Sequence, residues 1–174
     1  MIFTTKYSSP VGELTLASKD NMIIGICYAG QKYYMEGIKV SETTIKNNDP
    51  ILTQTKKWLD DYFAGKNPKI LDLPLCPEGS ETQHLVWALV CNIPYGDTNS
   101  PQRLAKMLAS LQEKGTVSEK DILSALDHNP ISIIIPTHRV VEDGKKLDYI
   151  GGEKALDFLL KLEIPVWEEV NNDK

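Results

Sequence analysis

This chain of 174 residues has few cysteines and no long apolar run, and each shortage excludes a class of protein. Cys27, Cys76 and Cys91 are an odd number with no CxxC spacing. That pattern excludes a disulfide framework and a zinc–cysteine site, and it indicates buried thiols of a cytoplasmic protein. No apolar run approaches the roughly 18 residues that a membrane span needs. Residues 1–6 also lack the basic start and apolar stretch of a secretory signal.

Positive charge is in short supply as well, chiefly in the second half of the chain. Residues 1–78 carry nine basic and nine acidic side chains, whereas residues 79–174 carry ten basic and fifteen acidic ones. A domain that grips a phosphate backbone usually presents a basic face. The net charge of −5 on residues 79–174 therefore counts against strong DNA binding, although a local basic patch can still occur.

The residues that are present, 41% hydrophobic and 25% charged, are typical of a globular protein. Alternation at period two predicts strands over 13–18 and 22–28, with a hairpin turn between them. Residues 51–64 have the amphipathic spacing of a helix, which Gly65 ends. The proline-containing stretch 66–80 then predicts a connection between two domains.

The second half is predicted to be mostly helical. Its helices are expected over 82–92, from Pro101 to about Gln112, from a cap at Ser118 to about Leu126, and over 153–162. The apolar run Ile131–Ile135 predicts a short buried strand. This order of elements is compatible with a helix-turn-helix module. The pattern alone therefore predicts a β-rich N-terminal domain joined to a mostly helical C-terminal domain.

Several motifs follow one another along the chain. They include Ser9–Leu14, Trp58–Gly65, Ile93–Thr98 and Tyr149–Gly152. The most specific of them is Asn129–Val141. From about residue 7 to residue 163 these motifs resemble the O6-alkylguanine-DNA alkyltransferase family, which has a methyl-accepting cysteine where this chain has threonine.

The resemblance implies an α/β, ribonuclease-H-like N-terminal domain over residues 1–75. It also implies a winged-helix-like, helix-turn-helix C-terminal domain over 79–165, with a tail at 166–174. In the family, the helix-turn-helix enters the minor groove and flips the damaged guanine into a pocket, where the cysteine takes the alkyl group irreversibly. No cofactor and no metal are implied, and a monomer without membrane contact is expected.

By its motifs, the resemblance places Thr137 at the acceptor position and Asn129, His138 and Glu163 in the relay that supports it. A thiol suits this chemistry because its pKa of about 8.5 is easily lowered. A threonine hydroxyl is a far weaker acid, and its methyl group crowds the attack. We therefore expect no alkyl acceptance. A hydrolytic triad of Thr137, His138 and Glu163 is a weaker alternative, because sequence similarity fixes no triad geometry.

The expected substrate-binding positions have changed too. Tyr149 and Ile150 fall on the pocket segment of the family. Pro101 stands in the place of the tyrosine that helps to rotate the phosphate, and Lys120 in the place of the arginine that fills the vacated base stack. Lysine keeps the charge of arginine but loses the planar group that can stack between bases. We therefore expect base flipping to be impaired.

The segment around Lys120 differs further from the family, which has small residues there. This chain has instead Glu119, Asp121, Ile122, Leu123 and Ser124. On a groove-facing helix, two carboxylates and two bulky side chains would face the phosphates. An ordinary solvated helix with Ile122, Leu123 and Leu126 turned inward explains these residues better.

Three classes of function stay open. The first is recognition of alkylated guanine in DNA without repair, and the retained Tyr149 and Asn129 favour it. The second is a role without DNA, as a binder of a small base-like ligand or as an interaction scaffold, and the acidic segment 119–121 favours it. The third is the hydrolase. For all three, we expect DNA to be at most a weak partner.

Overall fold

The computed structural model describes residues 1–111 and 117–168, which divide into two compact units. The first unit holds residues 1–78 and 130–135, and the second holds 79–129 and the chain from 136 onward. The predicted helix end at Gln112 and the tail beyond 168 lie outside the described residues. Within the described ranges, no helix is long and apolar enough to cross a membrane.

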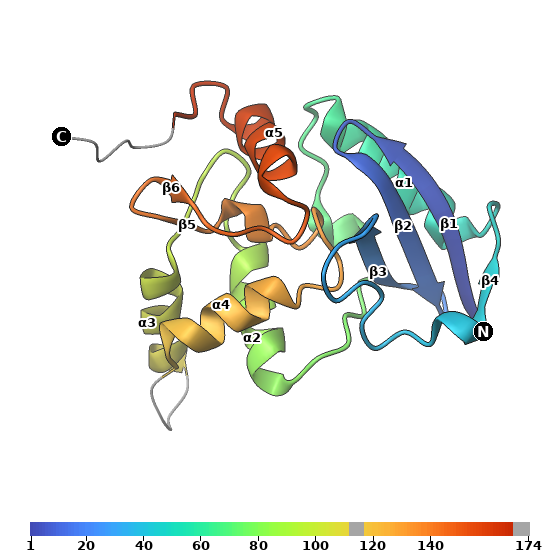
Figure 1. Ribbon diagram of the computed structural model, residues 1–174, viewed down its shortest axis with the longest axis horizontal. Coiled ribbons are helices and arrows are strands. Elements are labelled where there is room, and N and C mark those ends of the chain that lie inside the picture. The colour runs from blue at the N-terminus through green and yellow to red at the C-terminus, as the bar shows by residue number, and fades with distance from the viewer. Residues whose placement is uncertain (112–116, 169–174) are drawn as a thin grey trace. The chain divides into compact units, whose positions relative to one another are not determined.

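The first unit is built on a mixed sheet with one helix packed on it (Figure 1). The strand order is β3-β2-β1-β4, in which β1 to β3 are antiparallel and β4 runs parallel to β1. The strands and the helix are β1 (Ile2–Ser9), β2 (Gly12–Lys19), β3 (Met22–Tyr28), β4 (Thr43–Ile45) and α1 (Pro50–Phe63). The predicted strands correspond to β2 and β3, whereas β1 and β4 were not predicted.

Local signals explain where these elements begin and end. Asp20 and Asn21, between β2 and β3, both have positive φ, as a tight hairpin turn requires. The Asp49 side chain accepts a hydrogen bond from the Leu52 amide at 3.1 Å and so caps the N-terminus of α1. Gly65, with φ of 78°, follows the end of that helix. The predicted helix is therefore confirmed.

The apolar run Ile131–Ile135 is buried in the first unit, but it is not the strand that its composition predicts. It makes one short pairing with β3, in which the Ser132 amide donates to the Ile26 carbonyl at 3.1 Å. The Ile134 amide then donates to the Ser132 carbonyl at 2.9 Å, across Ile133 with φ of 74°. This is the pattern of a γ-turn, a strained conformation for a β-branched residue. The prediction was wrong because an apolar run does not reveal a tight turn.

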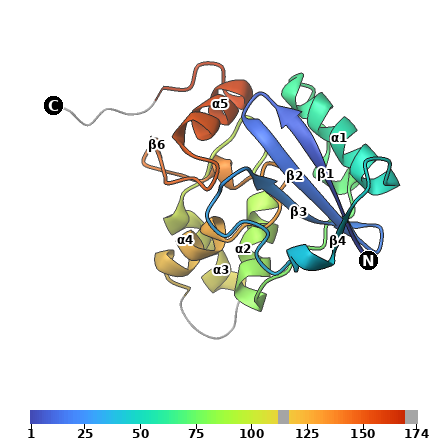
Figure 2. The ribbon, with the colours of Figure 1, turned by 45° about the vertical axis from the view of Figure 1, so that its right-hand side comes forward.

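In the second unit, three helices pack against one another and are followed by a hairpin and a last helix (Figure 2). The helices are α2 (Glu81–Cys91), α3 (Pro101–Leu111), α4 (Glu119–Asp127) and α5 (Glu153–Glu163), and the hairpin strands are β5 (Val141–Glu142) and β6 (Lys145–Lys146). Short 3₁₀ helices cover Val40–Glu42 and Ile70–Asp72 in the first unit and Thr137–Arg139 in the second. The helix predictions for this unit are confirmed to within about two residues wherever the chain is described.

Capping and apolar spacing position α4. Ser118 and Asp121 form the predicted capping box, with the Asp121 amide 3.2 Å from the Ser118 hydroxyl. Ile122, Ala125 and Leu126 face the core, whereas Leu123 is 39% exposed. The prediction that Leu123 points inward was wrong, because the buried positions follow the i, i+3, i+4 spacing from Ile122.

Candidate functional site

The expected acceptor position lies in a short buried turn of the second unit. Thr137 opens the 3₁₀ helix Thr137–Arg139 and is only 5% exposed. The side-chain amide of Asn129, which is itself buried, donates a hydrogen bond to the Thr137 hydroxyl at 3.2 Å. Two residues of the predicted relay therefore meet, and the hydroxyl oxygen is used as an acceptor.

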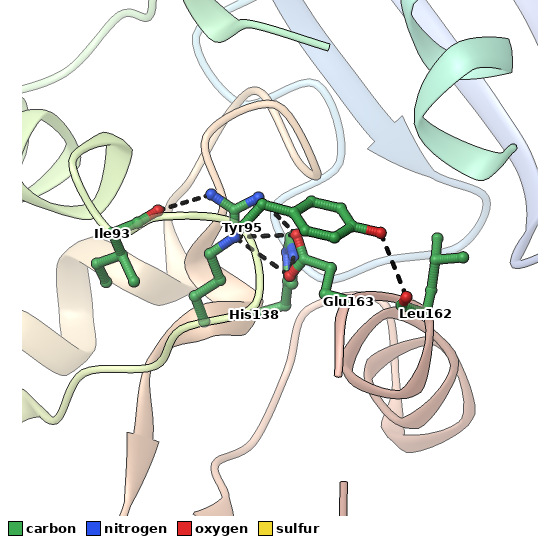
Figure 3. Close-up of polar contacts among 6 residues, drawn as sticks. Ile93, Tyr95, His138, Leu162 and Glu163 are labelled. Atoms are coloured by element: carbon green, nitrogen blue, oxygen red, sulfur yellow. Dashed lines mark hydrogen bonds and ion pairs between the residues drawn. The ribbon is translucent and has the colours of Figure 1, made fainter. Parts of the chain in front are cut away.

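The predicted histidine and glutamate also meet (Figure 3). His138 is the second residue of the turn, and Glu163 is the last residue of α5. The distance between His138 Nε2 and Glu163 Oε2 is 2.9 Å, and both side chains are buried. Glu163 therefore holds the imidazole in one orientation, as in an acid–base relay.

Arg139 takes part in the same network, although the motif analysis assigned it no role. Its Nε donates to both carboxylate oxygens of Glu163, at 3.0 and 3.2 Å, and its Nη1 donates to the Ile93 carbonyl at 2.7 Å. The signal in the sequence is a charged residue between two apolar stretches, Ile133–Ile135 and Val140–Val141. Such a position indicates a buried partner, because a buried charge is stable only when it is paired.

Tyr95 ties the loop after α2 to the end of α5. Its hydroxyl donates to the Leu162 carbonyl at 3.2 Å, as Figure 3 shows, and its ring centroid lies 5.8 Å from the guanidinium carbon of Arg139. Burial raises the pKa of Tyr95, and the negative charge of Glu163 raises it further against a smaller lowering by Arg139. The phenol therefore stays protonated and acts as a hydrogen-bond donor at neutral pH.

Burial and the neighbouring side chains act in opposite directions on the pKa of Glu163. Burial acts to raise the pKa of its carboxyl group. The charge interactions and hydrogen bonds with His138 and Arg139 outweigh that effect, and the pKa is lowered below its ordinary value. Glu163 is therefore ionised at neutral pH and joins the end of α5 to the turn Thr137–Arg139.

The cavity beside Thr137 is small. Its volume is about 10 Å³, which is about the room that one water molecule needs. The expected pocket residues Tyr149 and Ile150 line it with Thr137, so the structure brings these three predicted site residues together. The other lining residues are Leu126, Asp127, Val140, Leu147, Asp148 and Leu156. In this conformation the cavity has no room for a purine.

The two predicted DNA-handling positions are not part of that cavity. Pro101 is the first residue of α3 and is buried, and Lys120 is exposed on the first turn of α4. Glu119 and Asp121 are exposed on the same turn. Ile122 is fully buried, as the interpretation of a solvated helix predicts, whereas Leu123 is exposed.

Cys91 is poorly suited to act as an alkyl acceptor in place of Thr137. Cys91, at the end of α2, is the cysteine of the second unit, and burial raises its pKa to about 11 against a partial lowering by Arg139. It is therefore almost entirely protonated at neutral pH and a poor nucleophile. Among the described residues, no group of three or more histidine, cysteine or acidic side chains is placed to hold a metal ion.

Two family models match the chain, one on each side of residue 79. Residues 2–77 match the ribonuclease-like domain of 6-O-methylguanine DNA methyltransferase, and residues 81–164 match its DNA binding domain. The fold expected from the resemblance, a ribonuclease-like domain followed by a helical DNA-binding domain, is therefore confirmed.

Individual relatives agree with the family models over nearly the whole chain. The methylated-DNA–protein-cysteine methyltransferase of Methanosarcina acetivorans is 34% identical over 158 residues, which are 90% of this chain and 95% of that protein. The crystal structure of Mycobacterium tuberculosis OGT in complex with DNA superposes with a TM-score of 0.81 at 30% identity, covering 92% of each chain. The chain therefore belongs to the 6-O-methylguanine DNA methyltransferase family, a family of DNA repair proteins.

Proposed function

We propose that this protein binds duplex DNA weakly and does not accept alkyl groups. The observation that carries the proposal is a buried threonine at the acceptor position of the family, with its hydroxyl oxygen hydrogen-bonded to Asn129. Alkyl transfer needs a nucleophile that is partly ionised near neutral pH, and an aliphatic hydroxyl ionises far less readily than a thiol. Thr137 is therefore a structural residue in this proposal.

The intact relay is explained by its structural role. Glu163 joins the end of α5 to the turn Thr137–Arg139, and Arg139 joins that turn to the Ile93 carbonyl after α2. Removing any member would leave a buried charge or a buried polar group unpaired. We therefore assign His138 and Glu163 a stabilising role that persists without chemistry.

The binding of DNA is proposed from membership of the family and from the similarity to the mycobacterial protein that was crystallised in complex with DNA. Lesion recognition is not supported in the same way, because the cavity beside Thr137 is too small for a purine. A flipped base also costs a few kcal/mol of unstacking, and Lys120 has no planar group with which to fill the gap. We therefore expect an alkylated guanine to add little to the affinity.

A titration of labelled duplexes with and without a central O6-methylguanine, at near-physiological salt, tests this proposal. The expected result is weak binding, at micromolar or higher Kd, with the same affinity for both duplexes. Submicromolar binding with a clear preference for the lesion would move the protein into the class that recognises alkylated guanine without repair. An absence of binding to either duplex, even at low salt, would contradict the DNA part of the proposal.

A further inference from the structure

The second unit contains a larger cavity that shares no lining residue with the one beside Thr137. Its volume is about 320 Å³. Its walls are the loop that carries Thr98 and Asn99, the first turns of α3, and the turn of the β5–β6 hairpin at Asp143 and Gly144. Nothing in the relay uses these side chains, so the cavity has no part in the proposed structural role of that network.

Two basic side chains dominate this cavity. Arg103 and Lys106 both line it, and they are three residues apart, which places them on one face of α3. Both are exposed, and with the described residues neither forms an ion pair. Asp143 is the acidic residue of the lining, so two positive charges face one negative charge.

The distribution of charge on the neighbouring helix sharpens this observation. Residues Pro101–Leu111 of α3 include no acidic side chain, whereas the exposed face of α4 carries Glu119, Asp121 and Asp127. An anion therefore meets a favourable field at α3 and an unfavourable one at the start of α4. Arg103 and Lys106 on α3 therefore form a local basic patch, although residues 79–174 as a whole have a net negative charge.

We propose that this cavity is a phosphate-binding site and that its phosphate belongs to the DNA backbone, which builds on the proposed binding of DNA. Arginine and lysine are the side chains that pair with phosphate oxygens, and Thr98, Ser100 and Gln102 add neutral donors. The lining contains no aromatic residue, and Val141 is its only large apolar side chain. The base of a free nucleotide would therefore have no surface on which to stack, whereas a phosphodiester needs only the donors.

The proposal is tested by the salt dependence of binding to an undamaged duplex. Each of Arg103→Ala and Lys106→Ala removes one phosphate contact, so each lowers the slope of log K against log salt by about one. The loss of one such contact corresponds to a roughly eightfold weaker affinity for the duplex at 0.1 M salt. The matched control is Lys57→Ala, which removes an exposed positive charge from α1 of the first unit and should leave the slope unchanged.

Inorganic phosphate and adenosine monophosphate distinguish the two sources of the phosphate group. In an NMR titration of the full chain, both shift the backbone amides of Gln102 and Arg103 with similar midpoints, and Arg103→Ala abolishes the shifts. Binding of the nucleotide ten times more tightly than phosphate would make this a nucleotide site and overturn the proposal.

Duplex binding by the wild type and by the two variants distinguishes the phosphate site from the proposed function. A wild-type protein that binds duplex, with unchanged slopes in Arg103→Ala and Lys106→Ala, contradicts the phosphate site and leaves the proposed function standing. A wild-type protein that binds no duplex overturns the proposed function together with this assignment.

Discussion

The turn Thr137–Arg139 and the first turn of α4 lie in the same unit, but they differ in how strongly their surroundings constrain them. His138 and Arg139 are buried and bonded to Glu163, which is 25 and 24 residues away. Glu119, Lys120 and Asp121 are exposed to solvent. By the resemblance to the family, the buried segment matches the motif apart from Thr137, and the expected departures at Glu119, Lys120 and Asp121 fall on the exposed segment.

The comparison teaches that a relay that matches the family motif need not indicate a reaction. Removing one partner of a buried ion pair leaves the other charge buried and unpaired, which destabilises the fold. The network would therefore be retained for stability alone. Substitutions on an exposed helix turn usually change stability little. Its side chains can therefore vary with what the surface binds. The exposed turn is therefore the better indicator of what the protein does with DNA.

The largest expected effect comes from Glu163→Gln. The substitution removes the negative charge that two buried residues face, so we expect the free energy of unfolding to fall by about 3–5 kcal/mol. Chemical denaturation measures this loss. The control on the same helix is Lys161→Ala, which removes an exposed i, i+4 ion pair with Asp157 and should cost at most about 0.5 kcal/mol. Equal costs for both variants would show that the buried network is not the stabilising element.

The same network predicts a dependence of stability on pH. The pKa of Glu163 is lower in the folded protein than its ordinary value, because His138 and Arg139 outweigh the opposing effect of burial. The contribution of the ionised Glu163 to stability is therefore complete above the ordinary carboxyl pKa of 4.5. It is lost as the pH falls through the lower pKa of the folded protein. We expect the difference in unfolding free energy between wild type and Glu163→Gln to be present at pH 5, above the ordinary carboxyl value. It should narrow in more acidic solution, and a difference that grows there would contradict this assignment.

Thr137→Cys tests the buried site independently of the surface that is expected to bind DNA. The variant restores a thiol beside an intact relay, so we expect slow transfer from free O6-benzylguanine, measured by intact mass. Transfer from a duplex should stay far below that of active relatives, because Pro101 and Lys120 are unchanged. Thr137→Ser is the matched control and should show no transfer. Full repair of a duplex by Thr137→Cys would show that Pro101 and Lys120 matter less than we infer.

The helices of this protein follow from local signals, and for that reason the sequence predicts most of them. Asp49 and Ser118 cap helices whose apolar residues recur at helical spacing, and both helices begin next to those residues. The run Ile131–Ile135 carries an equally strong apolar signal, yet it folds into a turn at Ile133. The contact with β3 that decides its conformation joins residues about a hundred positions apart, and no local pattern contains it.

The sequence also predicted only part of the candidate site. The resemblance identified Thr137, His138 and Glu163, because the motif fixes their positions in the chain. It assigned no role to Arg139, whose partners lie 24 and 46 residues away, at Glu163 and Ile93. The cavity at α3 was also missed, since its walls come from two stretches that lie apart in the sequence, residues 98–106 and 141–144. Both features arise from tertiary packing, which residue spacing along one chain does not encode.

A smaller effect is expected from the carboxylates of α4. Glu119→Gln with Asp121→Asn removes two negative charges and keeps an oxygen at position 121 for the cap with Ser118. We expect duplex affinity to rise severalfold at low salt, because two repulsions with phosphates are removed. The control replaces two exposed carboxylates of the first unit, Asp20→Asn with Glu42→Gln, and should change affinity little. Equal gains from both double variants would mean that only net charge matters and that α4 does not lie near the DNA.

The central claim is that the protein accepts no alkyl group, and intact-mass measurement tests it most directly. The wild-type chain is incubated with an excess of duplex that contains O6-methylguanine, and an active relative under the same conditions serves as the positive control. The account predicts an unchanged mass for this chain and a gain of one methyl group for the relative. A stoichiometric gain in this chain, mapped to Thr137, Cys91 or any other residue, would contradict the account.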